Sequence, residues 1–183
     1  MCYNYGKLNR KIKMIKTKNT ISTFGKIWRI ALCISVPLGG GLIISMFTRD
    51  AMEKFGAFNQ PPLAPPAWLF PVAWTILYVL MGVASYLIYM KYRDGKKGEK
   101  SLAKTELIIY GLQLVLNFIW TPLFFSAGLC WVAFVVLILM WFAEIVLLML
   151  TFKNPRTAFW CLLPYLIWTT FAAYLNVGIA VLN

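Results

Sequence analysis

The polar residues that could contact a ligand are few, and they lie inside apolar stretches of the sequence. Gln113 and Asn117 are four residues apart and Trp120 follows three residues later, so the three share one face of a helix. An amide both donates and accepts hydrogen bonds. This face could therefore hold a polar group of a ligand, or it could bond to a neighbouring helix.

A second face of this kind lies near the carboxyl end. Pro164, Trp168, Ala172 and Asn176 recur every four residues. Pro164 removes a backbone donor and predicts a kink, and the small Ala172 leaves room beside Trp168. We interpret this face as one wall of a pocket, with simple helix packing as the alternative.

Three further residues are candidates for a functional role because they are aromatic or charged and lie inside apolar stretches. Trp74 and Tyr78 lie inside an apolar stretch and are candidates, with Trp168, to line an aromatic pocket, although helix packing would use them equally well. Glu144 is the one charged residue of its apolar stretch, and it could bind a proton or an ion or simply stay protonated. No catalytic or metal-binding set is predicted, because the chain has no histidine and its four cysteines lack metal-site spacing.

These residues must be positioned by helices that cross a membrane. Of the 183 residues, 61% are hydrophobic and 13% are charged, which excludes a soluble enzyme and a disordered chain. A bilayer core of about 30 Å needs about 20 apolar residues in a helix. Five stretches meet this length, and they predict an all-α, polytopic bundle of five transmembrane helices over 27–183: residues 27–47, 68–90, 107–127, 129–152 and 158–182.

The basic residues predict the orientation of this bundle. Residues 1–26 are expected to form a basic, disordered, cytoplasmic tail, and Met14 could be the true start. With the amino end in the cytoplasm and the carboxyl end outside, sixteen Lys and Arg residues lie inside and two lie outside. This distribution accounts for the net charge of +12 without nucleic acid, which is not an expected partner.

A proline-rich segment, residues 58–68, precedes the second span. Four prolines in six positions predict a stiff, extended loop. Such a loop could be a lid over an outward-facing pocket, or simply the segment that starts the helix.

Three blocks of sequence together resemble one known family. They are residues 61–82, which begin with Pro-Pro-Leu-Ala-Pro-Pro-Ala-Trp, residues 113–125, and residues 163–176. Their order and spacing resemble those of the TspO/MBR family, the translocator or tryptophan-rich sensory proteins. Two departures stand in the loop, where Gln60 replaces the usual Lys and Leu63 the usual Trp. A third is Val177, which replaces the Tyr of the cholesterol-recognition pattern of animal members.

The resemblance implies a five-helix membrane domain that binds porphyrins such as protoporphyrin IX, with the porphyrin as ligand and no cofactor. Position by position, it implies a pocket of Trp74, Asn117 and Trp168, surrounded by Phe70, Tyr78, Gln113, Trp131 and Ala172. It implies a lid loop with Pro61, Leu63, Pro65 and Pro66.

The expected role is sensing, transport or scavenging of a tetrapyrrole. Two alternatives are a light-dependent porphyrin-degrading enzyme and a secondary transporter for a small solute. The expected location is a bacterial plasma membrane with membrane lipid as a partner, and both a monomer and a homodimer remain open.

Overall fold

The computed structural model describes residues 5–48 and 58–183, with side chains from Thr23 onward. This part of the chain forms five helices, and each is long and apolar enough to cross a membrane. The all-α, five-span architecture predicted from the sequence is therefore confirmed. The helices are α1 (Tyr5–Phe47), α3 (Leu69–Asp94), α4 (Lys97–Phe125), α5 (Cys130–Thr151) and α6 (Arg156–Leu182).

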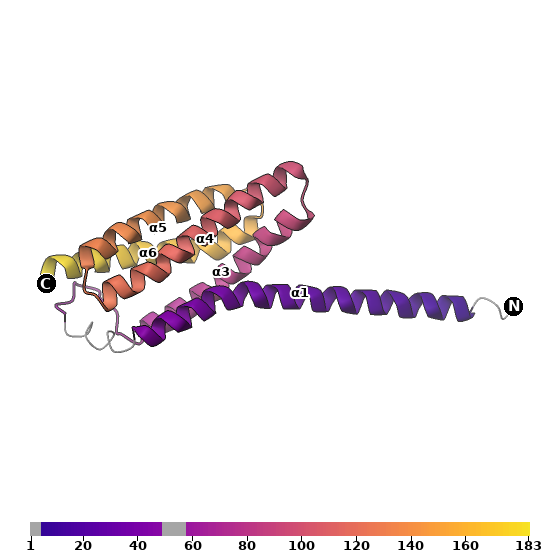
Figure 1. Ribbon diagram of the computed structural model, residues 1–183, viewed down its shortest axis with the longest axis horizontal. Coiled ribbons are helices and arrows are strands. Elements are labelled where there is room, and N and C mark those ends of the chain that lie inside the picture. Colours follow the sequence, from indigo (N-terminus) through magenta and orange to yellow (C-terminus); the bar gives the residue numbers. More distant parts are fainter. Residues whose placement is uncertain (1–4, 49–57) are drawn as a thin grey trace.

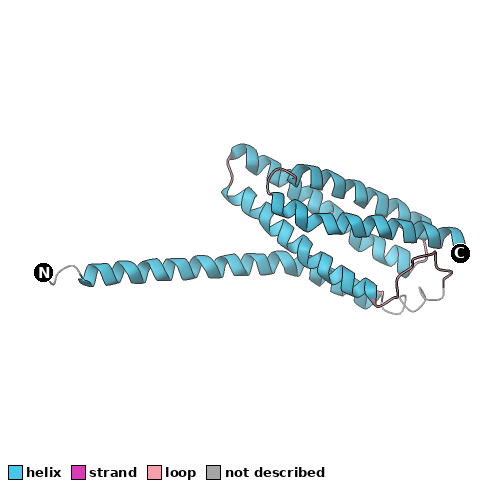
Figure 2. Ribbon diagram, turned by 180° about the vertical axis from the view of Figure 1, so that it is seen from behind, coloured by secondary structure: helices cyan, strands magenta, loops and turns pink. Residues whose placement is uncertain are grey.

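Four of these helices close on one another as a bundle. Helices α3, α4, α5 and α6 each pack against the next along the chain, and α6 packs back against α3. Helix α1 packs against α3 and α4, and its amino-terminal half extends away from the other helices (Figure 1). Figure 2 shows the same arrangement from behind. The interior of the bundle is therefore enclosed by α3 to α6, whereas α1 adds a fifth wall on one side.

Helix α1 approaches the bundle through glycine. A Cβ atom on Gly82 of α3 would lie 2.5 Å from the Cα atom of Ile34 in α1, so the two backbones are in contact there. On α1 itself, a Cβ atom on Gly40 would lie 2.2 Å from the ring of Phe118. Small residues allow this close packing where lipid offers no hydrophobic driving force between helices.

The amino-terminal segment differs from the expectation of a disordered tail over residues 1–26. Helix α1 begins at Tyr5 and continues without a break into the first membrane span. The sequence explains this continuity, because no proline occurs before Pro37 and Gly25 is the one glycine between Gly6 and Gly39. Residues 1–4 lie outside the described residues, as do Arg49 and Lys54 of the predicted loop before the second span.

The connections between helices α3 to α6 are short, as antiparallel neighbours require. The second span was predicted to end near Met90 and the third to begin near Leu107. In the structure, helix α3 continues to Asp94 and helix α4 already begins at Lys97. The basic residues expected in that loop are therefore mostly helical. The tight hairpin predicted around Gly128 is confirmed, since Gly128 takes a φ of 65° between α4 and α5.

An ion pair fixes the loop end of the bundle where α3 meets α4. Lys91 Nζ lies 2.7 Å from Glu106 Oε1, and the two side chains are 6% and 0% exposed. The same ammonium group donates a hydrogen bond to the carbonyl of Asn154, between α5 and α6, at 2.6 Å. Lys91 therefore links α3, α4 and the α5–α6 connection at this end of the bundle.

Candidate ligand-binding site

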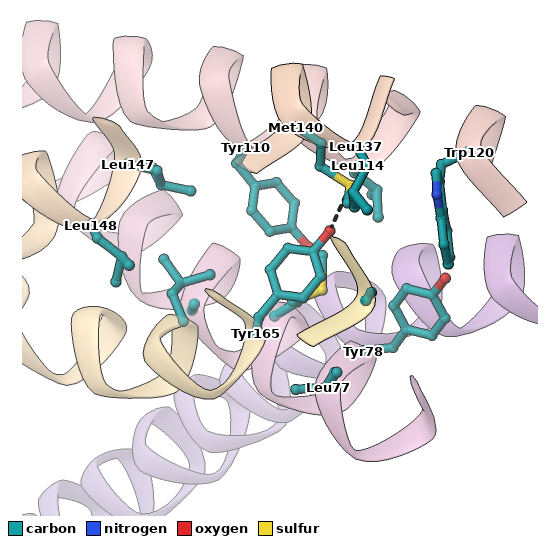
Figure 3. Packing of buried hydrophobic residues seen from close by; sticks show 14 of the residues in the cluster. Leu77, Tyr78, Tyr110, Leu114, Trp120, Leu137, Met140, Leu147, Leu148 and Tyr165 are labelled. Atoms are coloured by element: carbon teal, nitrogen blue, oxygen red, sulfur yellow. Dashed lines mark hydrogen bonds between the residues drawn. The ribbon is translucent and has the colours of Figure 1, made fainter. Parts of the chain in front are cut away.

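Asn117 joins three helices in the centre of the bundle. The Tyr78 hydroxyl of α3 donates a hydrogen bond to Asn117 Oδ1 at 2.7 Å, and Asn117 Nδ2 donates to the Tyr165 hydroxyl of α6 at 3.0 Å. The Tyr165 hydroxyl donates in turn to Met140 Sδ of α5 at 3.2 Å (Figure 3). Asn117 is fully buried, and a buried amide without hydrogen bonds is costly. The interhelical bonding that the sequence left open for Asn117 is therefore present.

The ring of Trp74 lies against this hydrogen-bonded centre. Its centroid is 5.4 Å from that of Tyr78, 6.1 Å from that of Trp120 and 6.1 Å from that of Tyr165. These separations are typical of interacting aromatic pairs. Because Trp74 contacts residues of α3, α4 and α6, its ring is held by three helices.

A cavity of about 550 Å³ lies beside Trp74, between the end of α1, the start of α3 and the end of α4. This volume is within the range of small-molecule sites in proteins. Phe70, Trp74 and Tyr78 form its aromatic wall, and Phe70 also lies edge-on to Trp168 with the centroids 6.0 Å apart. The residues that line the cavity are Gly41, Ile44, Ser45, Met46, Thr48, Ala67, Phe70, Pro71, Trp74, Tyr78, Thr121 and Phe125.

Two side chains near this cluster have buried polar atoms without a hydrogen-bond partner among the described residues. The atoms are the indole Nε1 of Trp168, whose ring packs edge-on against Phe70, and both amide atoms of Gln113, one helical turn before Asn117. Buried polar groups without partners are uncommon, and each calls for an explanation such as a water molecule or a ligand. Here an indole N–H and an amide could meet the oxygen atoms of a ligand that enters between the helices.

Most of the predicted pocket residues are brought together. Phe70, Trp74 and Tyr78 line the cavity, Asn117 bonds to Tyr78, and Trp168 packs on Phe70.

The other three predicted pocket residues lie differently. Gln113 is fully buried, and Ala172, one turn beyond Trp168, is also buried. Trp131 stands apart, because its side chain is 58% exposed at the start of α5 and its ring contact is with Phe134. The structure therefore does not place Trp131 with the cluster, and its position suits an aromatic anchor at the membrane interface.

Sequence reasoning missed two contributions to the site. One is Tyr165, which stands directly after Pro164 and which the helical spacing would have placed one turn before Thr169. The other is the end of α1, where Gly41, Ile44 and Ser45 line the cavity. Small and aliphatic residues give no chemical signal, although three consecutive glycines at residues 39–41 do indicate a close helix contact.

Asn176 has a structural partner set at the hairpin end of the bundle. It accepts a hydrogen bond from Trp120 Nε1 at 3.1 Å and donates to the Cys130 carbonyl at 2.8 Å. It therefore links α6 to the end of α4 and the start of α5, and it orients the Trp120 ring that supports Trp74.

The proline-rich loop is attached to α6. The Tyr174 hydroxyl donates to the Pro62 carbonyl at 2.6 Å, and Pro61 packs so closely on Gly178 that a Cβ atom there would lie 2.6 Å away. Leu63, with a φ of 67°, is 84% exposed.

Ala67 is the residue of the predicted 58–68 loop that lines the cavity. The predicted lid residues Pro61, Leu63, Pro65 and Pro66 are not among those that line it. Pro61 and Pro62 instead border a separate hollow of about 660 Å³ between the loop, α5 and α6.

The chain is similar in sequence to a known family and to several of its members. A sequence profile of the TspO/MBR family matches residues 33–182. The chain is 36% identical over 160 residues to the tryptophan-rich protein TspO of Chlorobaculum tepidum, an alignment that covers 86% of this chain and 98% of that protein. It is 35% identical over 142 residues to the translocator protein of Ovis aries, covering 77% of this chain and 82% of that protein. A third relative is the tryptophan-rich sensory protein of Cereibacter sphaeroides, 34% identical over 131 residues, with 72% and 77% covered.

Proposed function

Because the chain belongs to the TspO/MBR family, we propose that this integral membrane protein binds a flat tetrapyrrole such as protoporphyrin IX, in a sensory, transport or scavenging role. The observation that carries the proposal is the aromatic wall of the 550 Å³ cavity. Trp74 is partly exposed there and is backed by aromatic rings on three helices. A flat, apolar π system is the ligand that such a wall suits.

The polar groups around this wall support a ligand with acidic side groups. A porphyrin carries its carboxylates at one edge, so the rest of the ring can stay in apolar surroundings. The Trp168 ring packs edge-on against Phe70, which lines the cavity, and its Nε1 has no hydrogen-bond partner among the described residues. An indole N–H that donates to a carboxylate makes a charge-assisted bond, which is stronger than a bond between neutral groups.

The test is a titration of the purified protein in detergent with protoporphyrin IX, followed by quenching of tryptophan fluorescence and by porphyrin absorption. Trp74→Leu removes one ring of the aromatic wall but keeps an apolar side chain at this position. Loss of a buried stacking ring costs a few kcal/mol, of which aromatic pairing contributes about 0.5–1.5 kcal/mol. We expect the dissociation constant to rise about tenfold or more, at about 1.4 kcal/mol per decade.

Trp131→Leu is the matched control, since Trp131 is a tryptophan of the same bundle that is mostly exposed and lies apart from the cluster. Its dissociation constant, read from porphyrin absorption, should equal that of the unaltered protein. Equal affinities for folded Trp74→Leu and Trp131→Leu proteins would show that the ligand does not bind in this cavity. The absence of any saturable binding would show that the protein does not bind this tetrapyrrole.

We also propose that the protein lies in a bacterial plasma membrane with its amino end in the cytoplasm. Support comes from the basic residues at the ends of the described spans. Lys91 and Arg93 end α3, whereas no basic residue occurs between Thr105 and Phe152. Such an asymmetry orients membrane proteins with the basic side inside.

A further inference from the structure

Glu144 is a buried carboxyl group in the middle of α5 for which the proposed function has no use. Its side chain is 3% exposed, and Oε2 lies 2.7 Å from the hydroxyl of Thr169 on α6. The described residues contain two ion pairs, and Glu144 is in neither: they are Lys91–Glu106 and Arg93–Asp94. A carboxylate in apolar surroundings without a cation is costly, so this site favours the neutral acid.

Tyr165 is the titratable residue of α6 that faces this carboxyl group. It lies one helical turn before Thr169, just as Met140 lies one turn before Glu144 on α5. The Tyr165 hydroxyl has one proton and two acceptors within reach: Met140 Sδ, a weak acceptor at 3.2 Å, and the Glu144 carboxyl group.

Helix α4 also packs against α5, and its ionisable residues include no cationic partner for Glu144 in the middle of the bundle. The charged residue of the α4 interior is Glu106, whose partner is Lys91, and the titratable residue nearest to Gln113 along α4 is Tyr110. Neither supplies a positive charge to the middle of the bundle.

The same hydroxyl connects the region of Glu144 to the cavity. Tyr165 accepts a hydrogen bond from Asn117 Nδ2, and Asn117 Oδ1 accepts one from Tyr78, which lines the cavity. Two hydrogen bonds, of 3.0 Å and 2.7 Å, therefore separate the tyrosine beside Glu144 from the cavity wall. A change of charge at Glu144 would act on every member of this chain, because apolar surroundings screen charge weakly.

We propose that Glu144 is a proton-binding site whose protonation state controls the binding of anionic ligands in the cavity. With the proton bound, Glu144 is neutral and the Tyr165 hydroxyl donates to Met140 Sδ, from which it is separated by 3.2 Å. When the proton leaves to solvent, the carboxylate becomes the stronger acceptor, and the Tyr165 hydroxyl turns toward it. The new negative charge repels the carboxylates of a ligand. By linkage, an anionic ligand must then promote proton uptake to the same extent.

The proton site is tested without any ligand. Infrared spectra of the purified protein, minus those of Glu144→Gln, isolate the carbonyl stretch of the Glu144 acid from that of other carboxyl groups. We expect this band at neutral pH and its replacement by carboxylate bands as pH rises. Glutamine keeps the shape of the side chain and still accepts from Thr169, so the variant should fold. A carboxylate signal at neutral pH would overturn the proposal.

Coupling to the cavity, which rests on the proposed function, is tested with protoporphyrin IX and its dimethyl ester. At an effective dielectric constant of about 20, a new negative charge within roughly 12 Å of a ligand carboxylate lowers the affinity about tenfold or more. Between a pH at which the infrared spectra show the Glu144 acid and a higher pH at which they show the carboxylate, we expect the unaltered protein to lose about tenfold in affinity for the diacid. Glu144→Gln should show no such loss, and neither protein should show it with the ester.

Asp94→Asn serves as the control, because it removes an exposed carboxyl group and should keep the pH dependence of the unaltered protein. Identical pH profiles for the unaltered protein and Glu144→Gln would overturn the coupling. If neither porphyrin binds at any pH, the proposed function and the coupling both fail, whereas the infrared result still decides whether Glu144 holds a proton.

Discussion

The contact between α1 and the Tyr78 ring provides a sharp test of the site. Of two nearby glycines of α1, Gly41 lies against this ring and Gly39 does not. A Cβ atom on Gly41 would lie 2.2 Å from Cε2 and 2.8 Å from Cδ2 of Tyr78. A Cβ atom on Gly39 would have no heavy atom within 4 Å. Alanine at position 41 must therefore displace either the tyrosine ring or the helix, whereas alanine at position 39 meets open space.

The expected energies follow from these contacts. Replacing glycine by alanine within a helix gains about 1 kcal/mol, and Gly39→Ala should gain up to that amount. In Gly41→Ala this gain is opposed by overpacking, which costs about 1–3 kcal/mol, and by loss of the Tyr78–Asn117 hydrogen bond, about 1 kcal/mol. Gly41→Ala should therefore be less stable than the unaltered protein by roughly 1–3 kcal/mol, and less stable than Gly39→Ala by roughly 2–4 kcal/mol.

A reversible unfolding titration in detergent measures the two stabilities, and a protoporphyrin titration follows on the same samples. Because the Tyr78 ring lines the cavity, Gly41→Ala should also weaken porphyrin binding, whereas Gly39→Ala should leave it unchanged. Equal stabilities for the two variants would show that α1 does not contact Tyr78 in this way. A destabilised Gly41→Ala protein with unaltered affinity would separate the helix contact from the ligand site.

Two further predictions concern topology and the loop. A reporter that is active only in the cytoplasm, fused after Asn183, should be silent, because five spans with a cytoplasmic amino end place the carboxyl end outside; activity would contradict the orientation. Leu63→Trp should leave the rate of porphyrin dissociation, measured by stopped-flow absorption, unchanged, because Leu63 is 84% exposed on a loop that is attached to α6. A slower rate would show that the loop covers the cavity.

The number of spans could be predicted because the bilayer fixes how long an apolar stretch must be. The ends of the helices could not, because hydropathy reports where the membrane ends, whereas a helix ends where its backbone bonding stops. Between the second and third spans, the charged residues are good helix formers, so α3 and α4 continue until Gly95 and Lys96 interrupt them.

The faces of single helices could also be predicted, whereas the pairing of those faces could not. Spacing by four correctly grouped Gln113 with Asn117, which are both buried, and the partly buried Trp168 with the buried Ala172. Spacing says nothing about the helix opposite, so the bond from Asn117 to Tyr165 was not expected. Trp131 was placed in the pocket by resemblance alone, although its position at the start of a span is typical of an aromatic anchor at the membrane interface.

A buried amide can serve helix packing or ligand binding. Its hydrogen bonds within the protein distinguish the two roles. Both polar atoms of the Asn117 side chain are engaged, by Tyr78 and Tyr165, so a ligand could reach them only by displacing bonds between helices. Gln113, one turn away, has both polar atoms unbonded among the described residues. A ligand gains more from an unbonded group than from one it must first release. Asn117 therefore bonds to Tyr78, which lines the cavity, whereas Gln113 is the buried amide of this face whose polar atoms are unbonded among the described residues.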